Sequence, residues 1–430
     1  MKITIATFGS RGDTQPHLAL ALGLQRAGHR VTLVAPHDLA GWIRSYGVNV
    51  HPMHFSAQEF MQKPEVQAIL KSRNVVSQLK TVRHVLITLA AEVLDDTRQA
   101  TQEAEFLVLA ITACGGVDIA SRRGIPMAFA SLQPMFPPTR AFPSFFLPVR
   151  FSLGGGINYL TYSLFVRAVW PFIGGPFNRW RATRFGLPAW RSMPEMLNAG
   201  RRFGTPWLFG YSPQVVPKPP DWDDHHHVTG YWFLDPRPDW QAPAELARFL
   251  ESGPPPVYVG FGSMSNSDPE RQTRLALRAL ELARQRGVLS TGWGGIARLG
   301  SSADVFYVDD VPHSWLFPRM AAVVHHGGAG TTGAGLRSGV PSLITPFAGD
   351  QYAWADRAVK LGAGPRMGDA KNLTAEKLAQ AIDTAVSNPA LRARAAAIGD
   401  RIRAENGVTR AVELIEHHAK EFAGGFREKQ

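Results

Sequence analysis

Short apolar runs alternate with longer stretches of helical periodicity in the first part of the chain. This alternation is typical of a parallel α/β sheet. The apolar runs predict strands over 2–8, 30–35, 48–51, 106–111 and 126–130. The intervening periodicity predicts helices over 16–27, 37–46, 77–103 and 116–123.

The same rhythm restarts after residue 240. Strands are expected over 257–261, 287–290, 304–308, 321–325, 341–344 and 363–366. Helices are expected over 243–252, 270–286, 328–338, 350–361, 374–387, 390–404 and 409–421. The fold class is therefore α/β, with two facing, doubly wound Rossmann-like domains and a ligand cleft where the carboxyl ends of their strands meet. We expect a first domain (1–214), a linker (215–240), a second domain (241–405) and a last helical segment (406–430) that packs back on the first domain.

Residues 134–240 interrupt this rhythm and are rich in proline and aromatic side chains. Repeated prolines prevent a continuous helix over 134–150, whereas 158–180 has the pattern of one or two helices with a wide apolar face. One interpretation is an ordinary core insertion. The other is a segment that faces lipid or an apolar ligand, because apolar and basic residues are mixed there as in interfacial helices.

The composition indicates a folded protein, and its net charge indicates what kind of molecule the protein binds. Hydrophobic residues make up 45% of the 430 positions and charged residues 19%, as in a folded protein. The net charge of +11 favours an anionic partner, which is a nucleic acid, a membrane surface or a phosphorylated small molecule. No basic helix, zinc finger or RNA-binding aromatic motif is recognisable, so we do not expect nucleic acid to bind.

The single cysteine, Cys114, excludes an intrachain disulfide and a Cys₄ or Cys₂His₂ zinc site. The N-terminal residues have the pattern of a strand and a turn, which does not match a signal peptide. No uninterrupted apolar run reaches the roughly 18–20 residues of a membrane-spanning helix. We expect a cytoplasmic protein that can touch the inner face of the membrane peripherally without crossing it.

The first candidate site is the loop "TFGSRGDTQP" at 7–16. Because proline favours the first position of a helix, Pro16 predicts a helix start with Gln15 as its cap. Asp13 then lies ahead of the helix, where its carboxylate could take a proton from a ligand in the cleft. The alternative is a structural aspartate that shapes the turn.

The second candidate site is "VVHHGGAGTTGAGLRSGVP" at 323–341. A buried strand ends in two histidines, His325 and His326, and the glycines that follow permit a tight turn. Thr331 and Thr332 come where the next helix starts. Backbone N–H groups at a helix N-terminus, hydroxyl groups and a histidine donor together form a cradle for phosphate.

Two further loops follow strands of the second domain. Asp350 and Gln351 offer an acceptor and a mixed donor and acceptor, which suit the hydroxyl groups of a sugar. Gly262 and Ser263 form a short loop fit for a phosphate or a ribose. Adjacent acidic residues at 309–310 precede a proline turn, so we interpret them as loop residues and expect no metal site.

In this order, the motifs resemble those of the UDP-glycosyltransferase superfamily, which are inverting enzymes with the GT-B fold. The pairing of "GSRGD…P" at 9–16 with "HHGGAGTT…G…GVP" at 325–341 is specific, and the resemblance covers nearly the whole chain. It is closest to the branch of bacterial and fungal sterol glucosyltransferases and glycopeptide-antibiotic glycosyltransferases. The stretch "NRWRATRFGLP" at 178–188 is also similar to that branch. We expect a bacterial source.

The resemblance implies roles for individual residues. Asp13 matches the family's catalytic base, and Asp350 and Gln351 match the pair that holds the hydroxyl groups of the donor sugar. The positions that match other parts of the nucleotide site are Ser10, Arg11, Gly262, Ser263, Val311, Pro312, His326, Gly328, Gly330, Thr331 and Thr332. The plant enzymes have Trp and Asn where Ala329 and Gly330 stand, so plant rules for donor choice do not transfer.

The implied reaction moves a sugar, expected to be glucose, from a UDP-sugar to a hydroxyl group of an apolar acceptor such as a sterol, another lipid or an aromatic natural product. It needs no metal and no cofactor, because the UDP-sugar is a co-substrate. Two alternatives stay open: a nucleotide-sugar epimerase of the same fold, and a non-catalytic protein that binds a UDP-sugar or a lipid. The acceptor, the choice between UDP and dTDP and the oligomeric state are also open.

Overall fold

The computed structural model describes residues 1–430 except 63–88, 148–151, 263–267, 293–294, 301 and 428–430. Its first sheet has seven parallel strands in the order β3-β2-β1-β4-β5-β6-β7. The strands are β1 (Lys2–Ala6), β2 (Arg30–Pro36), β3 (Asn49–Met53), β4 (Phe106–Ala110), β5 (Met127–Ser131), β6 (Trp207–Phe209) and β7 (His226–Val228). Ile5 of β1 lies opposite Leu33 of β2 and Val108 of β4, and all three side chains are fully buried. Burial on both faces explains why these strands appear in the sequence as continuous apolar runs.

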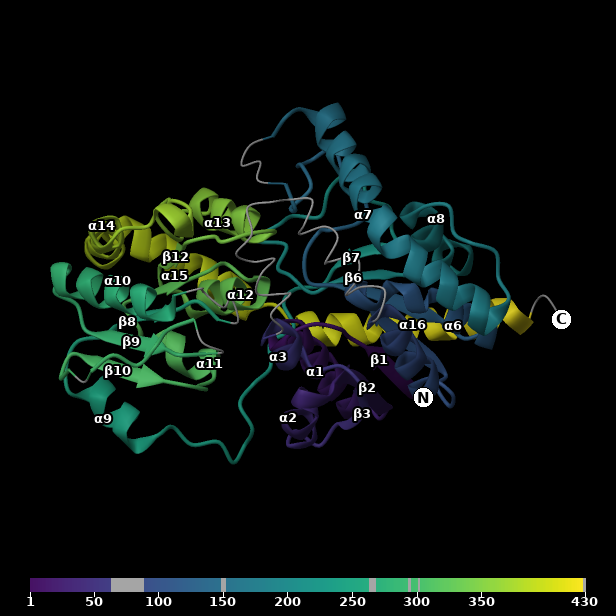
Figure 1. Ribbon diagram of the computed structural model, residues 1–430, viewed down its shortest axis with the longest axis horizontal. Helices are drawn as coiled ribbons and strands as arrows, with labels where there is room; N and C mark the ends of the chain where they lie inside the picture. Colours follow the sequence, from purple (N-terminus) through teal and green to yellow (C-terminus); the bar gives the residue numbers. More distant parts are fainter. Residues whose placement is uncertain (63–88, 148–151, 263–267, 293–294, 301, 428–430) are drawn as a thin grey trace.

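The second sheet has five parallel strands in the order β10-β9-β8-β11-β12. They are β8 (Val257–Gly260), β9 (Gly287–Ser290), β10 (Val305–Val308), β11 (Ala322–His325) and β12 (Ser342–Ile344). Figure 1 shows the two sheets side by side, each flanked by helices. The expected pair of doubly wound domains is confirmed.

Helices connect the strands in both domains. Those that precede the second sheet are α1 (Arg11–Arg26), α2 (Ala40–Arg44), α3 (Ala57–Gln62), α6 (Val117–Arg123), α7 (Gly155–Phe185), α8 (Met193–Asn198) and α9 (Ala244–Glu251). The later ones are α10 (Pro269–Leu282), α11 (His313–Leu316), α12 (Ala329–Ser338), α13 (Gln351–Lys360), α14 (Ala375–Ser387), α15 (Pro389–Arg403) and α16 (Gly407–Arg427). Residues 89–100 are also helical, and the earlier part of the helix expected over 77–103 lies outside the described residues.

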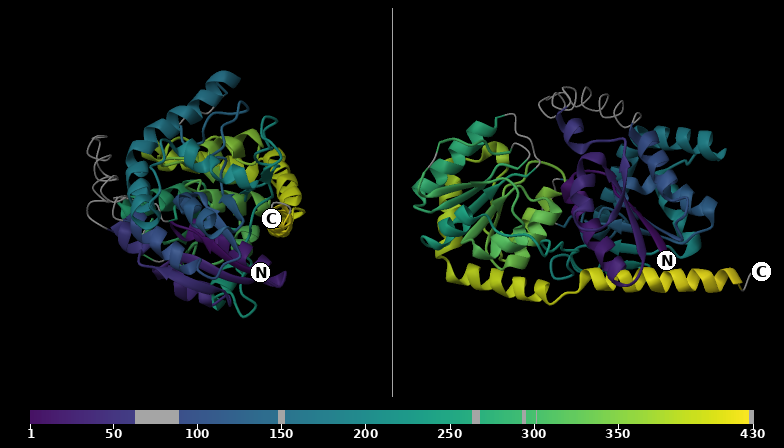
Figure 2. Two further views of the ribbon diagram at one scale, coloured as in Figure 1. Left: turned by 90° about the vertical axis from the view of Figure 1, so that its right-hand side faces the viewer. Right: turned by 90° about the horizontal axis from the view of Figure 1, so that it is seen from below.

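The last helix, α16, crosses back to the first domain, as the view from below in Figure 2 shows. It packs on α1, where Val408 fills the space beside Gly23. A Cβ at Gly23 would come within 2.3 Å of the Val408 side chain. Further along, His29 Nε2 lies 2.9 Å from Glu416 Oε1. The C-terminal helix therefore packs against the first domain.

Several segments differ from the pattern that the sequence predicts, and strand β6 is one that the sequence does not predict. Residues 226–228, within the expected linker, form strand β7 at the edge of the first sheet. A three-residue strand containing two histidines has no apolar run that would predict it. The His226 ring stacks on Trp207 and packs at a tilt against Trp222. Residues 363–366, expected as a strand, have no regular structure. Gly364 lies so close to the Ser342 carbonyl that a Cβ there would clash, so this stretch packs on β12 without extending the sheet.

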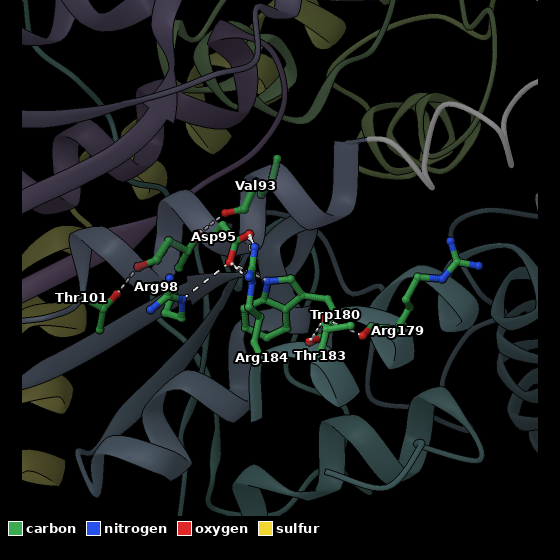
Figure 3. A network of polar contacts seen from close by, with 9 residues as sticks. Val93, Asp95, Arg98, Thr101, Arg179, Trp180, Thr183 and Arg184 are labelled. Carbon is green, nitrogen blue, oxygen red and sulfur yellow. Dashed lines mark hydrogen bonds and ion pairs between the residues drawn. The ribbon is translucent and has the colours of Figure 1, made fainter. Parts of the chain in front are cut away.

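The long helix α7 is fixed to the first domain along its C-terminal half. Figure 3 shows Asp95, in the helix over 89–100, accepting hydrogen bonds from Trp180 Nε1 at 3.0 Å and from Arg184 Nη2 at 2.6 Å. On the neighbouring turn Arg181 is buried and pairs with Asp118 of α6 at 2.8 Å. The sequence predicts one or two helices here, and the structure has one.

Candidate active site

A cavity of about 1270 Å³ lies between the two domains, at the carboxyl ends of both sheets. The predicted site residues that line it are Ser10, Arg11, Asp13, Gly262, Val311, Pro312, His326, Gly328, Gly330, Thr331, Asp350 and Gln351. Thr332 is buried and is not part of this lining. Ser263 lies outside the described residues. Side chains 340 positions apart in the chain therefore share one cavity, as the cleft at the strand ends predicts.

Helix α1 begins earlier than predicted, at Arg11 with Ser10 as its cap, so the helix start predicted at Pro16 is wrong. The Asp13 carboxylate accepts hydrogen bonds from Ser10 N–H at 2.8 Å and from Ser10 Oγ at 3.1 Å, both through Oδ2. This Ser-x-x-Asp pattern is a capping box, and it sets the helix start five residues ahead of the proline. Asp13 is therefore part of the cap as well as part of the cavity wall.

Burial raises the pKa of the Asp13 carboxyl, although the hydrogen bonds from Ser10 act in the opposite direction. Burial also raises the pKa of Asp350 to about 6, with a smaller contribution from the negative charge of Asp13. The two carboxyl groups thus face one cavity, and the charge of Asp13 disfavours the ionisation of Asp350. A carboxylate with a raised pKa is a stronger base than an exposed one.

His17, one turn after Asp13, supports the backbone of the loop. Its Nδ1 lies 2.7 Å from the carbonyl oxygen of Asp13. Burial lowers the pKa of His17 to about 4, so the ring is neutral and donates its Nδ1–H to that carbonyl. The imidazole packs edge-on against Trp232. His17 therefore contacts the main chain of Asp13 and not its carboxylate.

The loop after β11 brings a helix N-terminus to the opposite wall of the cavity. Gly328 caps α12, so the first N–H groups of that helix have no acceptor within it. The His326 ring lies between Gly262 and Gly328, since a Cβ on either would come within 2.8 Å of the ring. Burial lowers the pKa of His326 to about 4, which leaves a neutral ring with one N–H donor. This loop has the features of an anion-binding helix start.

The two helix starts meet at the edge of the cavity. A Cβ on Gly330 of α12 would lie 4.0 Å from the carbonyl oxygen of Gly12 in α1. Arg11 Nη1 lies 2.8 Å from Asp310 Oδ2, and the guanidinium lies 4.6 Å from the centre of the Trp42 ring. Arg11 therefore ties the first domain to the second at the wall of the site.

Asp350 and Gln351 lie at the start of α13. Trp354 Nε1 donates to Asp350 Oδ2 at 2.8 Å. Gln351 Oε1 accepts from Phe347 N–H at 2.8 Å and from Ala348 N–H at 3.2 Å, so the amide oxygen holds the loop. The mixed role that the sequence suggests for Gln351 is thus reduced to its NH₂ group, which is a donor.

Asp309 and Asp310 are loop residues with separate partners, because Asp309 pairs with Arg298 at 2.8 Å. The part of the chain that the structure describes contains no group of three or more His, Cys, Asp or Glu residues arranged to hold a metal ion.

Sequence reasoning missed the wall of the cavity formed by aromatic and arginine side chains. The Arg319 guanidinium lies 4.3 Å from the centre of the Trp315 ring, and the Arg337 guanidinium lies 4.5 Å from that of Phe233. All four residues line the cavity. The aromatic run at 231–233 is a signal for this wall, but it falls in the segment expected to be a linker.

Two family models match the chain. The Glycosyltransferase family 28 N-terminal domain matches residues 3–127, and the Erythromycin biosynthesis protein CIII-like, C-terminal domain matches residues 299–416. Sterol 3-beta-glucosyltransferases of Cryptococcus neoformans and Emericella nidulans are each 36% identical to it over 96% of its length. The chain spans only 27% and 30% of those two relatives. Both are fungal, and they do not support the expectation of a bacterial source.

Solved glycosyltransferase structures have the same fold over almost the whole chain. The kitacinnamycin glycosyltransferase has a TM-score of 0.70 and 23% identity, covering 97% of this chain and 99% of its own. The glycosyltransferase VinC, solved with dTDP, has a TM-score of 0.63 and 19% identity, covering 98% of this chain and 100% of its own. These structural likenesses show that the chain has the two-domain fold of these glycosyltransferases, and the two family models and the sterol glucosyltransferase relatives show sequence similarity along most of its length.

Proposed function

We propose that this chain is a glycosyltransferase that moves glucose from UDP-glucose to the hydroxyl group of a sterol or a similarly apolar acceptor, with inversion at the anomeric carbon. The observation that carries the proposal is the half-buried Asp13 carboxylate, which lines one cavity together with the N-terminus of α12. The names of the fungal relatives support a sterol acceptor and a glucosyl donor.

The donor diphosphate would bind at the start of α12. There the free N–H groups, the Thr331 hydroxyl and the neutral His326 ring can all donate to phosphate oxygens. The charge on the leaving diphosphate would be stabilised by these donors and the helix dipole, so no metal ion is needed. The donor sugar would be held by the Asp350 carboxylate and the Gln351 NH₂ group.

Asp13 would be the base. Because Oδ2 already accepts both hydrogen bonds from Ser10, Oδ1 is left to accept the hydroxyl hydrogen of the acceptor. The acceptor oxygen attacks the anomeric carbon, its proton passes to Asp13, and the bond to the diphosphate breaks on the opposite face. An alcohol is a far weaker acid than a carboxyl group, so the proton moves late, once the C–O bond is largely formed.

The acceptor would lie on the first domain, beside the loop that carries Asp13. Phe8, which precedes this loop, has its ring centre 4.7 Å from that of Phe55, and Phe55 lies 5.5 Å from Phe60. Leu132 and Gln133 line the cavity from the end of β5. Trp232 and Phe233 also line the cavity, and apolar side chains beside a polar base favour an apolar acceptor with one reactive hydroxyl group.

The test is incubation of the purified chain with UDP-glucose, UDP-galactose or dTDP-glucose, each with ergosterol, cholesterol or an aromatic alcohol. Release of the nucleotide diphosphate, product mass and anomeric configuration are measured. We expect a sterol β-glucoside from UDP-glucose. Retention of the α-configuration, a 2-epimer of the donor, or nucleotide binding without turnover would each overturn the proposal.

A further inference from the structure

The N-terminal half of α7 exposes large apolar side chains to solvent. Ile157, Tyr159, Leu160 and Leu164 are 55%, 45%, 48% and 53% exposed. In the rest of the described chain only Met1 and Leu282 are large apolar residues with comparable exposure. Ile157, Leu160 and Leu164 follow the i, i+3, i+7 spacing and so share one face of the helix. We call these four residues the α7 patch.

The α7 patch is held in a fixed position. Thr161 Oγ1 accepts from Ser144 N–H at 2.8 Å, and the Asn158 side chain donates to the Arg140 carbonyl oxygen at 3.0 Å. Tyr162 and Val166 of the same turns are buried in the core of the first domain. Figure 1 shows this half of α7 projecting from the body of the molecule. The exposed side chains of this half of α7 are therefore held in place relative to the first domain.

The surrounding segment is purely cationic. Between Asp118 and Glu195 the sequence has no acidic residue and nine arginines. Arg140 and Arg167 are exposed, and Arg167 follows Leu164 by three positions on the same helix. Gly155, at the start of α7, packs against the Arg140 side chain. From outside this segment, Asp221 accepts a hydrogen bond from the Arg140 N–H at 2.7 Å. An apolar stripe flanked by arginines is complementary to a surface with anionic headgroups and an acyl interior.

We propose that the α7 patch inserts into the interface of an anionic phospholipid bilayer while Arg140 and Arg167 lie among its phosphates. The seven-residue step from Ile157 to Leu164 is roughly 10 Å long, which suits a helix lying within the headgroup region. None of the described helices has the length and apolar character to cross a bilayer. This proposal is independent of the proposed glycosyl transfer, because α7 could bind a bilayer whatever the acceptor is.

The experiment is vesicle co-sedimentation of the full chain with phosphatidylcholine vesicles, either pure or containing phosphatidylserine. Leu160→Glu/Leu164→Glu tests the apolar contact, and Leu282→Glu, on α10 of the second domain, is its matched control. Arg140→Gln/Arg167→Gln tests the charge, and Arg271→Gln/Arg392→Gln is its control. Melting temperatures and turnover of a soluble alcohol are measured for every variant.

We expect the wild type to bind the anionic vesicles and to dissociate as salt is added. The leucine pair should lower the partition coefficient by about tenfold or more, and the arginine pair by roughly fivefold at low salt. Both controls should bind as the wild type does, and all variants should keep their melting temperature and turnover. Absence of wild-type binding, or unchanged binding of the leucine pair, would overturn the proposal. So would light scattering that shows a wild-type dimer converted to a monomer by the leucine pair without an effect on vesicle binding.

Discussion

Ser10 donates two hydrogen bonds to one oxygen of Asp13, from its backbone N–H at 2.8 Å and from its hydroxyl at 3.1 Å. The carboxyl group that we propose as the catalytic base is therefore also the acceptor that closes the first turn of α1. The two bonds stabilise the ionised carboxylate, whereas burial opposes ionisation. Removal of a hydrogen bond from Ser10 should therefore raise the proton affinity of Asp13.

Ser10→Ala removes the hydroxyl donor and keeps the backbone donor. The pKa of Asp13 should then rise further, because one of the groups that favour its ionised form is lost. A base acts only when ionised, so the acid limb of kcat/KM should move to higher pH by roughly 0.5–1 unit, as expected for the loss of one hydrogen bond. An acid limb that stays in place would contradict the assignment of that limb to Asp13.

Asp350→Asn should leave the acid limb assigned to Asp13 in place, even though weaker sugar binding lowers activity at every pH. The charge of Asp13 raises the pKa of Asp350, so Asp350 is still protonated and neutral over the pH range in which Asp13 ionises. The pKa of Asp350 is raised to about 6, so its ionisation destabilises the fold as pH rises through that value. The free energy of unfolding of Asp350→Asn minus that of the wild type should therefore be larger at about pH 7 than at about pH 4. Thermal unfolding measured at both pH values gives the answer.

His326→Ala should weaken UDP binding, because the ring lies between the glycines of two nucleotide loops. Loss of one hydrogen bond to a charged group corresponds to about a 5- to 150-fold increase in Kd. His417→Ala, on the exposed face of α16, is the matched control and should bind UDP normally. Calorimetry that gives the same UDP affinity for both variants would remove His326 from the site.

Chelation should leave the reaction intact. The diphosphate charge is assigned to the α12 N-terminus and its neighbouring donors, so kcat in excess EDTA should equal kcat without it. Loss of turnover on chelation, with recovery on addition of Mg²⁺ or Mn²⁺, would show that a metal ion takes part.

The strands and the glycine loops could be predicted from the sequence because their signals are local. Phe106–Ala110 is a continuous apolar run buried on both faces, and His326 and Gly328 follow such a run directly. The start of α1 cannot be read from the sequence alone, because Pro16 and the capping box of Ser10 and Asp13 indicate different positions. Both are valid signals of a helix start, and hydrogen bonding to the carboxylate decides between them.

Other features depend on contacts between distant parts of the chain. The pairing of Arg11 with Asp310 joins residues on different domains, and no local pattern specifies such a pair. Gln351 is adjacent to Asp350 in the sequence, but only the folded loop shows that its amide oxygen already has two donors. Sequence motifs therefore identify which residues reach the cleft better than they identify which atoms remain free there.

The most direct test of the account is kcat of Asp13→Asn with UDP-glucose and a sterol acceptor. Asparagine keeps an acceptor oxygen for Ser10, so α1 and UDP affinity should be preserved, but it cannot take the proton. Asp268→Asn, at the cap of α10, is the matched control for loss of a capping carboxylate and should retain full activity. We predict that kcat of Asp13→Asn falls by roughly 10²–10⁴ with little change in melting temperature. A variant that keeps more than about a tenth of wild-type kcat would mean that Asp13 caps the helix and is not the base.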